Sequence, residues 1–336
     1  MARLVDPSAD PDIPTLTTVL DPGELSKHLR LALPHWEWHT AQEIRLCVLR
    51  WHKASRCTFE VVLPTASGWP ELIGKVYAVD RSDIYRVMEE IRQAGFGSEE
   101  EFSIARPVLY LPSLRLLLYE KVPGTRAKTL IANQNASNRV AAVERCARWL
   151  ARFHAYAPRF GPVFHMEDCL SAWEAWLQGR AMTDLRFANK AWQLFAQLKT
   201  TAPGHHGVEM CAGHGTYTCS QLIFNNGQTF VIDWDTFNLA DPSHDLARFL
   251  VDLKRMALKH FGSIRALDWA AEVFLATYRA AGGCYLATHL SFEQAAFCLE
   301  RAKRDVDKQS RGWEERAEMM LDEGLRILDE TAKRKQ

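Results

Sequence analysis

The sequence predicts an α+β protein with two lobes: a small β-rich N-terminal lobe and a larger, mostly helical C-terminal lobe. Short β-rich runs crowd into residues 41–80, and a further strand pair is expected over 108–119. Most of the chain after these strands places apolar residues at helical spacing instead. With 336 residues, the chain is long enough to bury a core in each lobe. We expect an N-terminal extension with a helix over 1–39, an N-lobe over 40–122 and a C-lobe over 123–336.

The N-terminal extension divides into two parts. Residues 1–20 are rich in Pro and Asp, and we expect them to form a loosely held lead-in. From Asp21 onward, Leu25 and Leu29 recur at helical spacing, and Pro34 ends the predicted helix.

The N-lobe is expected to be an antiparallel meander with one helix. Its strands are predicted over 44–49, 58–63 and 72–77, separated by turn residues. Ser82 is expected to cap a helix that runs to Ala94. The apolar face of that helix comprises Ile84, Val87, Met88 and Ile91.

The C-lobe is expected to be helical, with a single strand pair over 222–232. The predicted helices lie near 137–156, 169–179, 184–199, 243–260, 266–281, 291–303 and 313–333.

Composition excludes several classes of protein. The formal net charge is zero, which argues against a broad polyanion-binding surface and thus against a nucleic-acid partner. No apolar stretch approaches the roughly 20 residues that a membrane helix needs. The N-terminus lacks the apolar region of a signal peptide, and the eight cysteines are scattered without a CxxC motif. Reduced thiols and a cytoplasmic location are therefore expected.

The stretch 211–246 carries the clearest chemical signal. A turn with His214-Gly215 precedes an apolar strand, a tight turn at 225–227 and a second strand. That second strand ends at Asp233-Trp234-Asp235. A strand pair with carboxylates at its far end is suited to holding a metal ion beside a phosphate.

The motifs HGxxxxxQ, IDWD and ADPSHDLA, with WLARFH upstream, resemble the aminoglycoside phosphotransferase family, which is related to the protein kinases. The resemblance implies a bilobal protein-kinase-like fold. It also implies transfer of the γ-phosphate of ATP, with Mg²⁺, to a hydroxyl group of a small molecule. Asp233 stands at the family's metal-ligand position and Gln221 at the position of its metal-binding Asn. Asp241 is expected to cap the next helix, and Asp245 to brace the His214 loop as its counterpart does in relatives.

Thr216 is a departure from the family. It follows His214-Gly215 directly, where the family has its catalytic Asp. A threonine hydroxyl is a poor base near neutral pH, and losing general-base catalysis typically costs about 10²–10⁴-fold in rate. His214, Thr216 and Asp235 are the candidate catalytic residues, with Asp235 as the substitute proton acceptor.

Lys75 is the candidate cation for the nucleotide phosphates. It lies in an apolar strand, and the alternative is an edge-strand lysine in solvent. The kinase interpretation requires a glutamate on the following helix. At about 100° per residue, Glu90 flanks the apolar face of that helix while Glu89 points away from it, so we expect Glu90 to be the partner.

The nucleotide loop is unusual. No GxGxxG motif occurs, and the turn between the first two strands contains no glycine. Arg56 or the N–H groups of this turn are the candidates for phosphate contact. By the resemblance, the backbone of Glu120 to Val122 binds adenine.

Three functions remain open from the sequence. The first is a small-molecule kinase with an impaired base. The second is a pseudokinase that binds nucleotide or ligand and regulates a protein partner. The third, a binding protein with no nucleotide role, is disfavoured because Lys75, Asp233 and Asp235 are all present.

Overall fold

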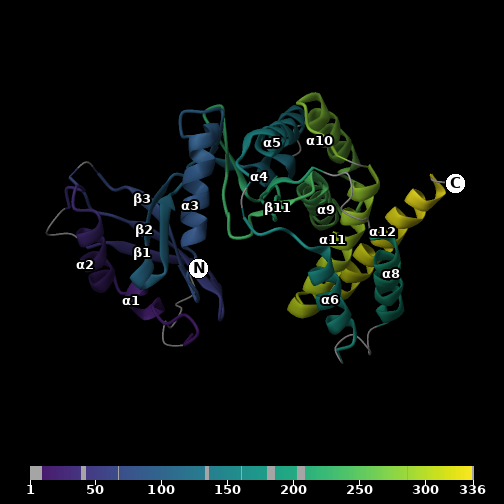
Figure 1. Ribbon diagram of the computed structural model, residues 1–336, viewed down its shortest axis with the longest axis horizontal. Helices are drawn as coiled ribbons and strands as arrows, with labels where there is room; N and C mark the ends of the chain where they lie inside the picture. The colour runs from purple at the N-terminus through teal and green to yellow at the C-terminus, as the bar shows by residue number, and fades with distance from the viewer. Residues whose placement is uncertain are drawn as a thin grey trace. The chain divides into compact units, whose positions relative to one another are not determined.

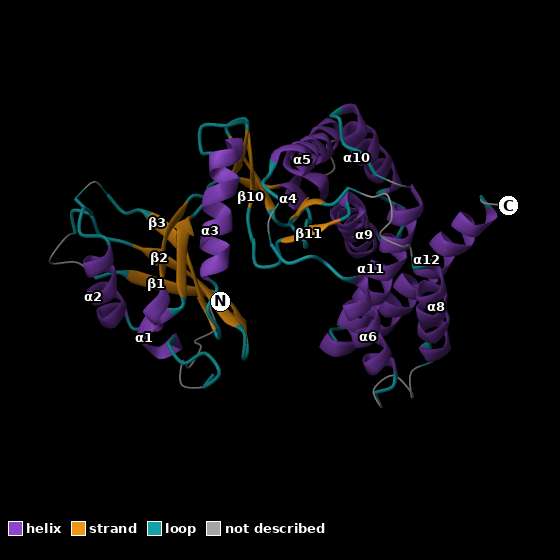
Figure 2. Cartoon of the chain, viewed as in Figure 1, coloured by secondary structure: helices purple, strands orange, loops and turns teal. Residues whose placement is uncertain are grey.

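The computed structural model divides the chain into two compact units. One comprises the chain up to Gly124 together with Asn225–Ile232, and the other comprises Thr125–Phe224 and the chain from Asp233. Strands predominate in the first unit and helices in the second, as predicted (Figures 1 and 2). The structure describes residues 10–38, 43–66, 68–132, 136–159, 161–179, 186–202, 209–285 and 287–334. The first two residues of the helix predicted over 184–199 lie outside these ranges.

The first unit is built on a five-stranded antiparallel sheet. Its order is β1-β2-β3-β6-β5, which confirms the predicted meander and hairpin. The strands are β1 (Arg45–His52), β2 (Arg56–Val62), β3 (Glu71–Tyr77), β5 (Pro107–Leu111) and β6 (Leu116–Glu120). A short strand that the sequence did not predict, β4 (Phe102–Ile104), pairs in parallel with β10 (Gln228–Val231).

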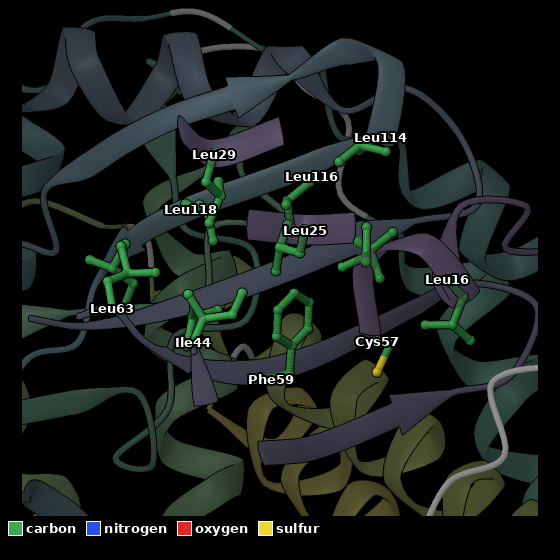
Figure 3. Packing of buried hydrophobic residues seen from close by; sticks show 14 of the residues in the cluster. Leu16, Leu25, Leu29, Ile44, Cys57, Phe59, Leu63, Leu114, Leu116 and Leu118 are labelled. Atoms are coloured by element: carbon green, nitrogen blue, oxygen red, sulfur yellow. The ribbon is translucent and has the colours of Figure 1, made fainter. Parts of the chain in front are cut away.

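The N-terminal segment covers one face of this sheet. Helices α1 (Leu16–Leu20) and α2 (Pro22–Ala32) pack Leu16, Val19, Leu25 and Leu29 against alternate residues of β2, β3 and β6 (Figure 3). The helix expected from Asp21 is confirmed, and the Asp21 carboxylate caps it. The expectation of a loosely held lead-in is wrong for residues 10–20, because their apolar side chains complete the core of the sheet.

Helix α3 (Ser82–Ile91) lies on the other side of the sheet from α1 and α2 (Figure 1). Its four predicted apolar residues are all buried. Ser82 does not cap it: the N-cap residue is Arg81, and the Ser82 hydroxyl donates to Asp80 Oδ2 at 2.8 Å. The helix continues as a π-helical turn, η2 (Arg92–Phe96), and a 3₁₀ turn, η3 (Pro112–Leu114), separates β5 from β6.

The second unit is mainly helical. Its described helices are α4 (Ala127–Ala132), α5 (Ala136–Tyr156), α6 (Met166–Leu177), α8 (Ala188–Thr201), α9 (Pro242–Phe261), α10 (Asp268–Ala280), α11 (Ala287–Lys308) and α12 (Trp313–Lys333). Within the described ranges, none of the helices combines the length and hydropathy required to cross a membrane.

The strands of this part of the chain are more numerous than the sequence predicted. The expected pair is present as β9 (Leu222–Asn225) and β10, and Asn226 and Gly227 between them both have positive φ. Two further pairings occur, however. β7 (Thr125–Arg126) pairs with β9, and β8 (Cys211–Gly213) pairs with β11 (Asn238–Ala240). These strands of two or three residues are too short to leave a periodic signal.

Candidate phosphotransfer site

The loop that follows β8 is interlocked with the loop that precedes β11. Gly213 pairs with Asn238 in the two-stranded sheet. Gly215 has φ +77°, and a Cβ atom at that position would lie 2.0 Å from the carbonyl oxygen of Thr236. The two loops therefore approach at a distance that only glycine permits.

Asp245 in the first turn of α9 braces this loop. Its carboxylate accepts the N–H of His214 at 2.6 Å and the N–H of Gly215 at 2.9 Å. Its side chain is 1% exposed. Asp241 caps the same helix by accepting the N–H of Ser243 at 2.7 Å, and Pro242 begins it. Both carboxylates thus have the anchoring contacts that the sequence suggested.

His154 and Asp245 form a buried pair. His154 Nε2 lies 3.5 Å from Asp245 Oδ2, and Nδ1 lies 2.8 Å from the hydroxyl of Tyr278. Burial lowers the pKa of His154, but Cys211, Tyr278 and Asp245 together raise it well above its usual value. Burial raises the pKa of Asp245, but His154 and, more weakly, the other neighbouring histidines lower it from 3.8 to about 2. His154 is therefore a hydrogen-bonded core residue, as expected.

Thr216 takes part in a network of hydroxyl and amide groups. Its hydroxyl lies 2.9 Å from that of Thr236 and accepts a hydrogen bond from Gln221 Nε2 at 3.3 Å. Gln221 Oε1 accepts from the N–H of Thr218 at 3.0 Å and from its hydroxyl at 2.8 Å. The oxygen expected to bind metal thus already accepts two hydrogen bonds from its own loop.

Asp233 and Asp235 flank Trp234 in the loop after β10. Asp233 is half-buried and has φ +76°, a left-handed conformation that is rare for residues other than glycine. Such strain concentrates at functional sites. Asp235 is 8% exposed, and the ring of Trp234 lies 4.8 Å from that of His214. This packing fixes the loop against the His214 loop.

Among the described residues, no three histidine, cysteine or acidic side chains gather as metal ligands do. Mg²⁺ is usually held by one or two carboxylates together with substrate phosphates rather than by an all-protein cage. Asp233 at a strained loop position fits that coordination pattern.

Lys75 lies in the first unit, on the face of the sheet away from α1 and α2. It pairs with Thr58 across β2, and Gly74 and Val76 on either side of it face the N-terminal helices. β3 is a central strand and Lys75 is 4% exposed. The alternative of a solvated edge-strand lysine is therefore wrong.

Arg56 shares this face with Lys75, because it pairs with Tyr77, two residues along β3. On α3, Glu90 is exposed whereas Glu89 is half-buried. Burial lowers the pKa of Arg92, and the hydrogen bond to Glu120 raises that of Arg106; the charge of Glu89 is a smaller raising influence on both. Glu90 therefore stays a prediction as the partner of Lys75, and the half-buried Glu89 is a second candidate.

The segment expected to bind adenine follows β6. The N–H of Glu120 donates to the carbonyl of Arg106 at 2.9 Å, and that of Lys121 donates to the carbonyl of Glu71 at 3.1 Å. The N–H groups of Glu120 and Lys121 therefore already have backbone partners.

A known protein family matches the part of the chain that contains most of these residues. The phosphotransferase enzyme family (APH) matches residues 70–284, which is more than half of the chain. The chain belongs to this family. The match includes Lys75, the His214 loop and the Asp233 loop of this phosphotransferase, but it does not include residues 10–69.

Solved structures share the fold at low sequence identity. A choline kinase from Cryptosporidium parvum superposes with a TM-score of 0.66 at 10% identity, covering 94% of this chain and 97% of that one. A putative aminoglycoside phosphotransferase from Ralstonia eutropha gives 0.61 at 15% identity, covering 91% and 98%. An amicoumacin kinase in complex with AMP-PNP, Ca²⁺ and Ami gives 0.59 at 15%, covering 91% and 93%. A search of curated proteins finds no match.

Two polar residues, one in each unit of this phosphotransferase, lie beside candidate site residues and were not predicted from the sequence. Thr236 is exposed and contacts both Thr216 and, at 3.2 Å, the carbonyl of His214. His52 pairs with Arg56 and lies on the face of Lys75. No motif marks Thr236, but the register of β1 against β2 would have identified His52.

Proposed function

We propose that this chain is a small-molecule kinase that transfers the γ-phosphoryl group of ATP to a hydroxyl group, with Thr216 in place of the family's catalytic aspartate. Family membership supports the reaction class. The amicoumacin kinase bound to AMP-PNP and Ca²⁺ supports the use of a nucleotide and a divalent cation.

The observation that carries the proposal is the loop held by Asp245. Two short hydrogen bonds from His214 and Gly215 to one buried carboxylate make this loop rigid. Phosphoryl transfer requires little covalent chemistry from the protein and depends on positioning and electrostatic stabilisation. A loop fixed in this way supports a catalytic role even without an aspartate at position 216.

The nucleotide is proposed to bind along the sheet face that carries Lys75 and Arg56. Both cations would neutralise phosphate oxygens, and a glutamate on α3, Glu89 or Glu90, would orient Lys75. The Glu120 carbonyl and the Val122 N–H would hold the adenine.

Asp233 is proposed to hold Mg²⁺ together with phosphate oxygens. The metal would supply charge neutralisation of the phosphates. Gln221 is the second candidate ligand, but its oxygen would first have to leave the Thr218 N–H and hydroxyl, so we expect weaker binding than Asp233 provides.

The acceptor hydroxyl has no carboxylate at position 216 to take its proton. The Thr216 hydroxyl orients the acceptor by hydrogen bonding, and Asp235 is the carboxylate proposed to take the proton. Without Asp235 the loss of general-base catalysis would lower the rate by about 10²–10⁴-fold relative to an enzyme with aspartate, and a substitute base recovers part of it.

A pseudokinase that binds nucleotide and regulates a protein partner is the second candidate. It is favoured by the network around Thr216, in which Gln221 joins the hydroxyl to the Thr218 turn without any carboxylate. Such a closed network leaves the acceptor end without a base while the nucleotide-binding residues remain.

An ATP-consumption screen against hydroxyl-bearing metabolites and antibiotics tests the kinase, with Asp233→Asn as the matched control. Asparagine tolerates the left-handed backbone of position 233, so the variant removes the charge without adding strain. Turnover that disappears in Asp233→Asn supports the kinase. If ATP·Mg²⁺ raises the melting temperature but no acceptor is phosphorylated, the pseudokinase is favoured. If ATP·Mg²⁺ does not raise it, both proposals fail.

A further inference from the structure

In the turn between β1 and β2, two backbone N–H groups already donate hydrogen bonds within the protein. The N–H of Ser55 donates to the carbonyl of His52 at 3.0 Å. The N–H of Ala54 donates to the carboxylate of Asp10, at 3.0 Å to Oδ2 and 3.3 Å to Oδ1. A glycine-rich loop presents such groups to phosphates, whereas here they are already bonded. Phosphate contact from Ala54 and Ser55 therefore does not come from their N–H groups.

Asp10 is buried and holds the turn from one side. It is 2% exposed, and Oδ2 also accepts the indole N–H of Trp51 at 2.7 Å. Ala54 has φ +58°, a left-handed conformation that is unfavourable for alanine. The hydrogen bond from the Ala54 N–H to the Asp10 carboxylate stabilises this conformation.

The carboxylate acts from the face of the sheet opposite to the cations. Trp51 pairs with Cys57, which faces the N-terminal helices, whereas Arg56 is on the face of Lys75. Asp10 is therefore separated from a bound phosphate by the sheet, and its charge does not contact the nucleotide.

The N-terminal segment is itself firmly anchored. Ile13, Leu16 and Val19 are at most 1% exposed in the core of the sheet. The hydroxyl of Thr15 donates to the carbonyl of Leu114 at 2.7 Å. Asp10 thus connects the turn to a fixed part of the core.

We propose that Asp10 is a positioning residue for nucleotide binding: it holds the β1–β2 turn, and with it the start of β2, where Arg56 lies on the phosphate-binding face. The inference rests on the proposed function, and it concerns residues 10–56, which lie outside the region matched by the family. A turn that is already ordered loses less conformational entropy when the nucleotide binds. In this proposal Asp10 orders the β1–β2 turn, which has no glycine-rich sequence, before the nucleotide binds.

The test compares Asp10→Ala and Trp51→Phe with Thr15→Ala in the full chain. Thr15→Ala is the matched control because it removes one hydrogen bond of the same segment without touching the turn. Calorimetry gives the affinity for ATP·Mg²⁺ and for adenosine, and hydrogen exchange follows the Ala54 amide. We expect Asp10→Ala to weaken ATP·Mg²⁺ binding about tenfold, equivalent to about 1.4 kcal/mol, and to leave adenosine binding unchanged.

Trp51→Phe, which removes one hydrogen bond to Asp10, is expected to weaken ATP·Mg²⁺ binding by a smaller factor. It keeps the proposal testable if Asp10→Ala does not fold. Faster exchange at Ala54 should accompany the loss of affinity. If both variants bind ATP as Thr15→Ala does, or lose ATP and adenosine affinity equally, the inference is overturned. If the unmodified chain binds no ATP, the proposed function fails and the positioning role with it. The exchange data still show, in that case, whether Asp10 holds the turn.

Discussion

Replacing Asp245 by asparagine tests the electrostatics at the centre of the site. The carboxylate accepts two backbone N–H groups and lies against His154. Asparagine has nearly the same shape but one accepting oxygen, so either His214 or Gly215 would lose its acceptor. A buried N–H without a partner costs about 1–3 kcal/mol, and removing one member of a buried pair costs about 3–5 kcal/mol. We expect Asp245→Asn to lower the free energy of unfolding by about 2–4 kcal/mol at pH 6.

The pH dependence gives this prediction its sharpest form. The pKa of Asp245 falls from 3.8 in the unfolded chain to about 2 in the folded one, which corresponds to about 2 kcal/mol. Because the folded pKa is lowered, this contribution is present above pH 3.8 and is lost as the pH falls toward 2. The raised pKa of His154 acts in the other direction: its contribution is present below 6.5 and is lost as the pH rises through the folded value.

Urea unfolding of the unmodified chain and of Asp245→Asn across this pH range measures the difference between their free energies of unfolding. This difference should be largest between pH 3.8 and 6.5 and should shrink on either side. NMR titration of His154 should show its pKa moving down in Asp245→Asn. Asp21→Asn at the exposed N-cap of α2 is the control, because asparagine is as good a cap as aspartate. A loss below about 0.5 kcal/mol, or a difference that does not change with pH, would refute the argument.

Three further variants address the loops. Thr216→Asp should fold, since the hydroxyl of Thr236 and Gln221 Nε2 can both donate to a carboxylate there. In the ATP-consumption assay we expect its rate to rise by about 10²–10⁴-fold if the kinase proposal holds. An unchanged rate would contradict that proposal. Asp233→Ala should lower the free energy of unfolding by about 1 kcal/mol more than Asp233→Asn, because alanine tolerates the left-handed backbone poorly; equal stabilities in urea would show that this backbone is not strained. Gly215→Ala should destabilise by more than about 3 kcal/mol, because its Cβ would overlap the carbonyl of Thr236; an unchanged midpoint in thermal melts would mean that the loops separate easily.

Elements with long periodic segments were predicted from the spacing of their apolar residues. Helix α12 begins at Trp313 and ends at Lys333, as predicted, because its apolar residues recur at helical spacing throughout. Asp241 and Pro242 formed a recognisable N-cap before α9. In contrast, β8 and β11 have three residues each, and their pairing joins Cys211–Gly213 to the distant Asn238–Ala240, so no local pattern encodes them. Ser82 shows the limit of capping rules, since its hydroxyl bonds Asp80 instead.

The sequence identified candidate site residues by their motif positions, but it did not give their burial or their hydrogen-bond partners. Lys75 was found because its charge interrupts an apolar strand, but only the sheet order showed that it is buried. The partner of Lys75 stays a prediction: helix phase points to Glu90, but Glu90 is exposed and the neighbouring Glu89 is half-buried. A motif could assign Gln221 to a metal position, but not foresee that its oxygen bonds Thr218.

The sequence by itself determined the α+β class, the loops at His214 and Asp233, and the absence of a carboxylate at Thr216, because these are properties of adjacent residues. Tertiary structure decided which carboxylates brace the site and which N–H groups are already bonded. Asp245 reaches back 30 residues to Gly215, and Asp10 reaches forward 44 residues to Ala54. Both contacts form only when the chain folds a distant carboxylate into a buried position, where the loss of water makes its hydrogen bonds obligatory.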